Sequence, residues 1–158
     1  KMDKLGKSSL SLADLYDSLA QVFIKQGQYE LAEEHLDQAL DIKVSKLGEE
    51  HSKVASSLLS SSKLYHRKGM FDVALEYLNE SFKINILKLG DDHPHVADIY
   101  EGMARTFFDQ SSYDEALMYS NLCLEIRLKK LGDNHPNVAQ IFVGIASIYN
   151  VQALYNEA

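Results

Sequence analysis

Histidine, cysteine and their acidic neighbours are the side chains here that could bind a metal ion or act as a nucleophile. The chain has 158 residues, with six histidines and one cysteine. The densest group of such side chains is Asp91, Asp92, His93 and His95. A zinc site would need a second ligand group at a recognisable spacing, and the sequence has none. We therefore expect no metal site, and we expect these aspartates to stabilise the start of a helix.

Motifs that carry catalysis are also absent from the sequence. There is no phosphate loop of the form GxxxxGK[ST], no GxSxG elbow and no HExxH pair. Cys123 shares a column of small residues with Ala39 and Ser81, which recur at one constant interval along the chain. We interpret it as an inert core thiol rather than a nucleophile. The sequence therefore predicts no catalytic residue and no cofactor, and the protein is not expected to be an enzyme.

The spacing of the histidines indicates a tandem repeat. His51, His93 and His135 are evenly spaced along the chain, so they belong to successive units instead of surrounding one ion. The dipeptide Leu-Gly recurs with the same period, at positions 5, 47, 89 and 131. Repeats of this kind are supersecondary units that stack and cover each other's apolar faces. We predict one array segment over residues 1–158, with repeats at about 5–46, 47–88, 89–130 and 131–158, the last incomplete.

Apolar residues within each unit follow the period of a helix. One stripe holds Tyr16, Leu19, Ala20 and Phe23, and it returns in the later units. These stripes predict a first helix, helix A, at about 12–26, 53–68, 95–110 and 137–151. A second helix, helix B, is predicted at about 29–46, 71–88 and 113–130. The break between them is expected at Gly27, Gly69 and Ser111, and Ala153 stands in the same column.

The starts and the ends of the units give further expectations. Pro94 and Pro136 suit the first turn of a helix, where the missing N–H has no partner to lose. The Leu5-Gly6 pair should close an earlier helix B, and the fourth helix B should begin near the end of the chain without being completed. On this interpretation we expect the chain to be an excised fragment of a longer protein. Phe142, Ile145 and Tyr149 should lack a covering helix, and the fragment should be able to self-associate through its open ends.

Composition bounds the class of protein. Apolar residues make up 46% of the chain, which is enough for a continuous core. The net charge of −7 and a pI near 5.3 argue against nucleic acid as a partner. No apolar run approaches the roughly 18 residues of a membrane span, and no secretory signal is present. With a single cysteine, these features favour a cytoplasmic protein that does not bind membranes.

The helix pair with small residues at these places resembles the tetratricopeptide repeat (TPR). The usual TPR unit has about 34 residues, and the 42-residue form with a Leu-Gly-x-x-His-Pro-x-Val-Ala linker is similar to the repeats of kinesin light chains. Residues 89–97 read LGDDHPHVA and residues 131–139 read LGDNHPNVA, whereas unit two has Ser52 in place of the proline. The resemblance implies an all-α fold, a right-handed superhelical solenoid of antiparallel helix pairs.

The resemblance also implies that helix A lines a concave groove. Kinesin light chains carry paired asparagines on this face, but this sequence has DS, LS, EG and VG there, so that mode of cargo binding is not carried over. Apolar pockets are expected beside exposed Phe108, Ile24, Leu59 and Val143. Lys63, Arg67 and Arg105 form a predicted basic strip, and a solvated face neutralised by nearby acids is the alternative. The groove positions chosen as partner-binding are Gln21, Leu59, Lys63, His66, Arg67, Glu101, Arg105, Phe108 and Asn150.

These features predict a non-enzymatic scaffold that binds a protein, either an acidic peptide or a helical segment, in the concave groove. Two alternatives remain open. The segment is an architectural spacer or oligomerisation element, or it is a regulatory sensor array of a larger signalling protein or motor adaptor.

Overall fold

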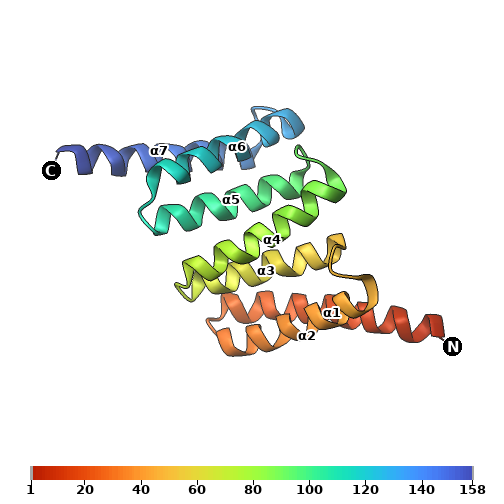
Figure 1. The fold of residues 1–158 in the computed structure, drawn as a ribbon. Coiled ribbons are helices and arrows are strands. Elements are labelled where there is room, and N and C mark those ends of the chain that lie inside the picture. The colour runs from red at the N-terminus through yellow and green to blue at the C-terminus, as the bar shows by residue number, and fades with distance from the viewer. Residues whose placement is uncertain (1, 158) are drawn as a thin grey trace. The chain divides into compact units, whose positions relative to one another are not determined.

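The computed structural model of the chain describes the backbone of residues 2–157 and the side chains of residues 10–157. Seven helices and no strands occur in this part of the chain (Figure 1). Their bounds are α1 (Met2–Lys25), α2 (Tyr29–Leu47), α3 (Ser52–Arg67), α4 (Phe71–Leu89), α5 (Pro94–Asp109), α6 (Tyr113–Leu131) and α7 (Pro136–Glu157). The predicted all-α array is confirmed, with α1, α3, α5 and α7 as the A helices and α2, α4 and α6 as the B helices.

The chain divides into two compact units between the second and third predicted repeats. The N-terminal unit, residues 1–88, contains α1, α2, α3 and nearly all of α4. The C-terminal unit, residues 89–158, contains α5, α6 and α7. Helices α1 and α2 lie side by side in the first unit, as α5 and α6 do in the second (Figure 1).

Residues with positive φ end most of the helices. The break after an A helix uses Gly27 and Gly69, both with φ of 74°, and Ser111 with φ of 63°. Glycine enters this left-handed region at little steric cost, whereas serine does so under strain. Gly48 follows α2 with φ of 87°, and its N–H donates to the carbonyl of Val44 at 2.9 Å. The expected breaks at these positions are confirmed.

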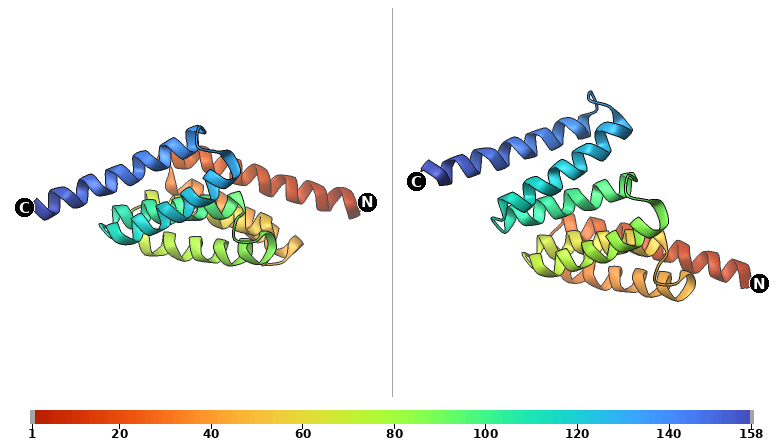
Figure 2. Two further views of the ribbon diagram at one scale, coloured as in Figure 1. Left: turned by 90° about the horizontal axis from the view of Figure 1, so that it is seen from above. Right: turned by 45° about the horizontal axis from the view of Figure 1, so that its top comes forward.

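Two expectations about the ends of the units are wrong. The fourth helix A was expected to end near residue 151, but α7 continues through Ala153 to Glu157, as its uninterrupted ribbon in Figure 2 shows. Alanine is the best helix former and is penalised in the left-handed region, so the chain keeps its helix. The Leu5-Gly6 pair lies inside α1 instead of closing an earlier helix. The first unit has Ser9 where the later units have His51, His93 and His135, and no proline follows it.

The histidine column caps the A helices. The Nδ1 atom of His51 accepts a hydrogen bond from the backbone N–H of Lys53 at 3.1 Å. His93 and His135 make the same bond two residues ahead, also at 3.1 Å. Each bond satisfies one of the amides left without a partner at a helix start. Helices α5 and α7 begin at Pro94 and Pro136, as predicted.

The small-residue columns form the core. In the N-terminal unit Ala20 and Ala32 are fully buried, beside Leu36 and Leu64, so the backbones of neighbouring helices approach closely. Ile24 belongs to the same cluster at 9% exposure, so the prediction that it is exposed in a groove is wrong. Its side chain points from α1 toward the core.

Helix α7 is the least covered of the A helices. Phe142 and Tyr149 are about half exposed, as the sequence predicted for a stripe without a covering helix. Within residues 2–157, α7 is also the one helix long and apolar enough to cross a membrane, judged by its length and composition. The expectation that no segment is long and apolar enough for a membrane span is therefore wrong. The Asn, Gln and Ser residues interrupt the apolar run of α7, but they do not make the helix as a whole polar. Length and composition of one helix are weak evidence of a span, and α7 packs against α6, where Gln152 donates to Asp114 at 2.9 Å.

Candidate functional site

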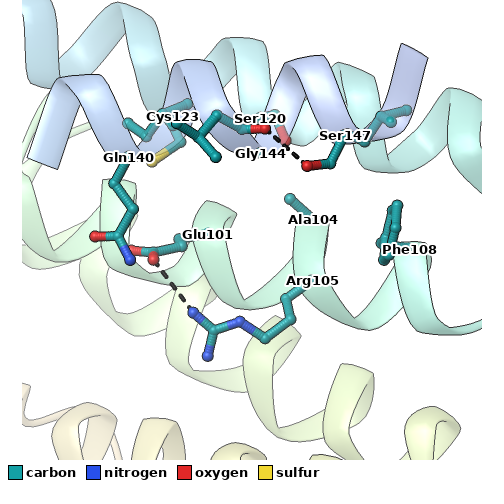
Figure 3. A pocket seen from close by; sticks show the side chains of 12 residues that line it. Glu101, Ala104, Arg105, Phe108, Ser120, Cys123, Gln140, Gly144 and Ser147 are labelled. Carbon is teal, nitrogen blue, oxygen red and sulfur yellow. Dashed lines mark hydrogen bonds and ion pairs between the residues drawn. The ribbon is translucent and has the colours of Figure 1, made fainter. Parts of the chain in front are cut away.

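A pocket of about 300 Å³ lies in the C-terminal unit (Figure 3). It is formed by α5 on one side, α7 on the other, and two residues of α6 between them. Its lining residues are Glu101, Ala104, Arg105, Phe108, Ser120, Cys123, Gln140, Ile141, Val143, Gly144, Ser147 and Ile148.

The floor of the pocket is apolar. Ala104, Ile141 and Ile148 are between 3% and 8% exposed. Phe108, which also lines the pocket, is partly buried. Its ring meets the ring of Tyr113 edge-on, with centroids 5.6 Å apart. When an apolar group of a ligand replaces water at such a surface, the free energy of the system falls.

Cys123 contributes sulfur to the floor but not reactivity. Its side chain is 1% exposed, and burial raises the pKa of its thiol to about 11. The thiolate is the nucleophilic form, so this thiol is inert near neutral pH. The interpretation of Cys123 as a core thiol is confirmed.

Charged side chains stand at the rim. Nη2 of Arg105 lies 3.3 Å from Oε1 of Glu101, one turn back on α5 (Figure 3). The other carboxylate oxygen, Oε2 of Glu101, lies 2.7 Å from Nη2 of Arg127 on α6. Arg127 is 9% exposed and also holds Oδ1 of Asp98 at 2.9 Å. Glu101 is therefore shared between a buried arginine and an exposed one.

The N-terminal unit carries the same kind of network two repeats earlier. Nζ of Lys43 is 3.2 Å from Oδ1 of Asp14, pairs closely with Asp17, and donates to the hydroxyl of Ser57 at 3.1 Å. Hydrogen bonds from Lys53 and, less strongly, from Lys43 hold the pKa of the Asp14 carboxyl below its usual value. Lys43 is only 2% exposed. The carboxylates of Asp14 and Asp17 therefore have to offset the cost of removing its ammonium group from water.

The repeat between these two networks is neutral. Asn85 stands midway between positions 43 and 127, and Ser56 and Leu59 take the places of the two acids. Asn85 is 4% exposed, and its Nδ2 donates to the carbonyl of Ser81 at 3.0 Å. Among the described residues, its Oδ1 has no hydrogen-bond partner. The buried cation and its acids thus occur together or not at all.

Sequence reasoning missed Lys43 and Arg127. Both continue an apolar stripe of helix B, where Lys43 follows Ala32, Leu36 and Ala39 at helical spacing. A basic residue at a core position, opposite acids on helix A in the same repeats, was the available signal.

The model of the tetratricopeptide repeat matches residues 11–86, 63–129 and 95–158. The chain belongs to the tetratricopeptide repeat family. TPR repeats generally mediate protein–protein interactions, and proteins built from them are typically scaffolds without catalytic activity. No curated protein matches the sequence.

Solved structures share this TPR fold. BtubC (BKLC) from P. vanneervenii aligns with a TM-score of 0.79 and 22% identity, over 90% of this chain and 57% of that one. A Podosopora anserina protein with nearly identical TPR-like repeats, described as a candidate kinesin light chain, aligns with a TM-score of 0.81 and 23% identity. That match covers 94% of this chain and 70% of the other, and a single-residue variant of the same protein gives a TM-score of 0.80. The resemblance to kinesin-light-chain-like TPR repeats is confirmed, and this chain spans little more than half of BtubC.

The pocket brings together three of the residues predicted to bind a partner, Glu101, Arg105 and Phe108, all on α5. Five others lie in the N-terminal unit, and one lies on α7 outside the pocket lining. Lys63, Arg67 and Asn150 are exposed, Leu59 is partly buried, Gln21 donates to Ser60 at 2.8 Å, and the ring of His66 lies 5.5 Å from that of Phe71. Their role in binding stays a prediction.

Proposed function

We propose that this TPR chain is a non-enzymatic, cytoplasmic interaction module that binds a peptide or helical segment of a partner protein on its A helices. The pocket of the C-terminal unit is the anchoring site. The observation that carries this proposal is the pocket itself, in which an apolar floor meets a small number of polar groups at the rim. Sites of this composition are the usual places where proteins hold a ligand.

The pocket fits one anchoring side chain. A volume of about 300 Å³ is at the lower end of the range for ligand sites. Burial of one Leu, Phe or Met side chain there contributes about 1.5–3 kcal/mol. Gln140 and Ser147 at the edge are exposed and offer hydrogen bonds to the backbone of a bound segment.

Charge favours an acidic partner. Lys63 and Arg67 are exposed one turn apart on α3. In the C-terminal unit, Arg105 is exposed at the rim of the pocket, where it can contact an acidic residue that flanks the anchoring side chain while it stays paired with Glu101. Complementary charge of this kind speeds association and selects partners.

The test is a pulldown with the wild-type chain and with a triple variant, Lys63→Glu, Arg67→Glu and Arg105→Glu, with captured proteins identified by mass. The matched control reverses three exposed lysines on the B helices, Lys46→Glu, Lys83→Glu and Lys88→Glu, with the same change in net charge. A partner retained by the control and lost by the first variant is the expected result. Equal capture by all three proteins, or none by any, would contradict the proposal.

An oligomerisation role is the second candidate, because α7 exposes several large apolar side chains. Leu154 and Tyr155 are 68% and 67% exposed, and Val143 is 67% exposed. Apolar surface of this kind often marks an interaction site. Sedimentation of the wild-type chain and of a Leu154→Ser/Tyr155→Ser variant decides the matter: a monomer mass for both at high concentration would eliminate this candidate.

A further inference from the structure

The two units present the same helix-A pair with different side chains at the place of the pocket. Helices α1 and α3 of the N-terminal unit correspond to α5 and α7 of the C-terminal unit, two repeats later. The pocket residues therefore have counterparts that can be compared one by one. The pairs are Ala20 with Ala104, Gln21 with Arg105, Ile24 with Phe108, Ser60 with Gly144 and Leu64 with Ile148.

In the N-terminal unit this place is closed. Nε2 of Gln21 on α1 donates to the hydroxyl of Ser60 on α3 at 2.8 Å, so two polar side chains bridge the helices. Beside this bridge, Ile24 is 9% exposed and Leu64 is fully buried. The space is filled by the chain's own side chains.

In the C-terminal unit the bridge between the two A helices is absent, although Ile148, in the place of Leu64, is buried as well. Gly144 has no side chain, and a Cβ built there would meet nothing within 4 Å. Arg105, in the place of Gln21, is held by Glu101 on its own helix instead of bridging to α7. Phe108 packs edge-on against Tyr113, and Figure 3 shows Gly144 facing Ala104 across the open space.

The charges around the opening cancel. The side chains of Arg105 and Arg127 carry two positive charges, and the carboxylates of Glu101 and Asp98 that they contact carry two negative ones. An isolated ligand charge would therefore find no net countercharge in the pocket, whereas its apolar floor favours an uncharged group.

We infer that Arg105 and Gly144 determine which unit accepts a ligand: the C-terminal unit takes one bulky, uncharged apolar side chain of the partner segment, and the Gln21–Ser60 bridge closes the N-terminal unit to it. This inference rests on the proposed function and assigns its anchoring step to two positions. Gly144 leaves space at the position that Ser60 occupies in the other unit, and Arg105 pairs within its own helix instead of crossing that space.

Toluene is a suitable probe, because it is small, uncharged and apolar, and its binding does not require the partner to be known. Amide shifts in 1H–15N NMR spectra of the full chain report where it binds. In the wild type, toluene should shift the amides of α5 and α7 around Ala104 and Gly144, and leave those around Gln21 and Ser60 unchanged. Shifts of equal size in both units, or none at all, would overturn the inference.

Exchange of the two pairs makes the test reciprocal. Arg105→Gln/Gly144→Ser introduces the N-terminal bridge into the C-terminal unit and should abolish the toluene shifts there. Gln21→Arg/Ser60→Gly removes the bridge and should produce new shifts in α1 and α3, while those in α5 and α7 persist. Unchanged shifts in the first variant, or no new ones in the second, would overturn the inference. Thermal unfolding and far-UV circular dichroism of both variants confirm that they are folded.

The same variants separate this inference from the proposed function. A partner segment that binds the wild type and the Arg105→Gln/Gly144→Ser variant equally would leave the binding function intact and overturn the role of the two positions. Loss of the partner and of the toluene shifts together in that variant, with the partner retained by Gln21→Arg/Ser60→Gly, supports both.

Discussion

The buried ion network around Arg127 leads to an asymmetric prediction about stability. Arg127 is 9% exposed, whereas the side chains of its partners Asp98 and Glu101 are 47% and 32% exposed. The combined Asp98→Asn/Glu101→Gln change leaves a desolvated guanidinium without countercharge, and an uncompensated buried charge destabilises a protein by about 3–5 kcal/mol. The Arg127→Met change fills a similar volume and leaves two carboxylates that water can reach. We expect it to cost only about 1.5–3 kcal/mol, the scale of a lost hydrogen bond to a charged group.

Urea unfolding followed by circular dichroism measures both effects. At this chain length 1 kcal/mol corresponds to a shift of roughly 2–4 °C in Tm, so thermal scans provide a second measure. Lys129→Met on the same helix is the control, because Lys129 pairs with Asp92 at an exposed site and its loss should leave the midpoint unchanged. If Arg127→Met proves more destabilising than the double change, burial of the cation does not dominate and the reasoning is refuted.

Three further predictions follow from single positions. Ser111→Gly should stabilise the chain by about 1 kcal/mol, because Ser111 has φ of 63° and glycine relieves that strain; an unchanged or lower urea midpoint would contradict this. The Cys123 thiol should react with Ellman's reagent at pH 8 only when the chain is unfolded, since burial raises its pKa to about 11; rapid reaction of the native chain would show otherwise. Hydrogen bonds from Lys68 and then Tyr65 lower the pKa of Glu33 from 4.5, so its stabilisation is present above that pH and is lost as the pH falls through the folded value. Glu33→Gln should therefore destabilise the chain at pH 7 and much less at pH 3, and an equal loss at both pH values would disprove the linkage.

Much of the fold could be predicted from the sequence because the repeat supplies the same information several times. The columns of Ala20 and Ala32 indicated where helices approach, and Gly27 and Gly69 indicated where they end. The prediction failed where one repeat departs from the others. Ala153 occupies a glycine column without glycine's conformational freedom, so α7 runs on.

The site was less predictable, because it depends on where side chains point. Arg105 was predicted as part of a basic strip, but it bonds to Glu101 on its own helix. The pocket arises where Gly144 lacks a side chain, and a helical glycine has no sequence signal that distinguishes an opening from a filled contact. Lys43 and Arg127 looked like ordinary charges of a surface helix until their burial was seen.

The alternation of charged and neutral repeats bears on how an array of similar helices finds its correct order during folding. Tandem repeats misassemble when a helix packs one repeat out of step, because the apolar stripes are interchangeable. A slip of one repeat would set Lys43 against Ser56 and Leu59 instead of Asp14 and Asp17, and would bury an ammonium group without a carboxylate. That mismatch costs several kcal/mol. The buried cations therefore destabilise pairings that are shifted by one repeat, which the apolar columns alone would not distinguish from the native pairing.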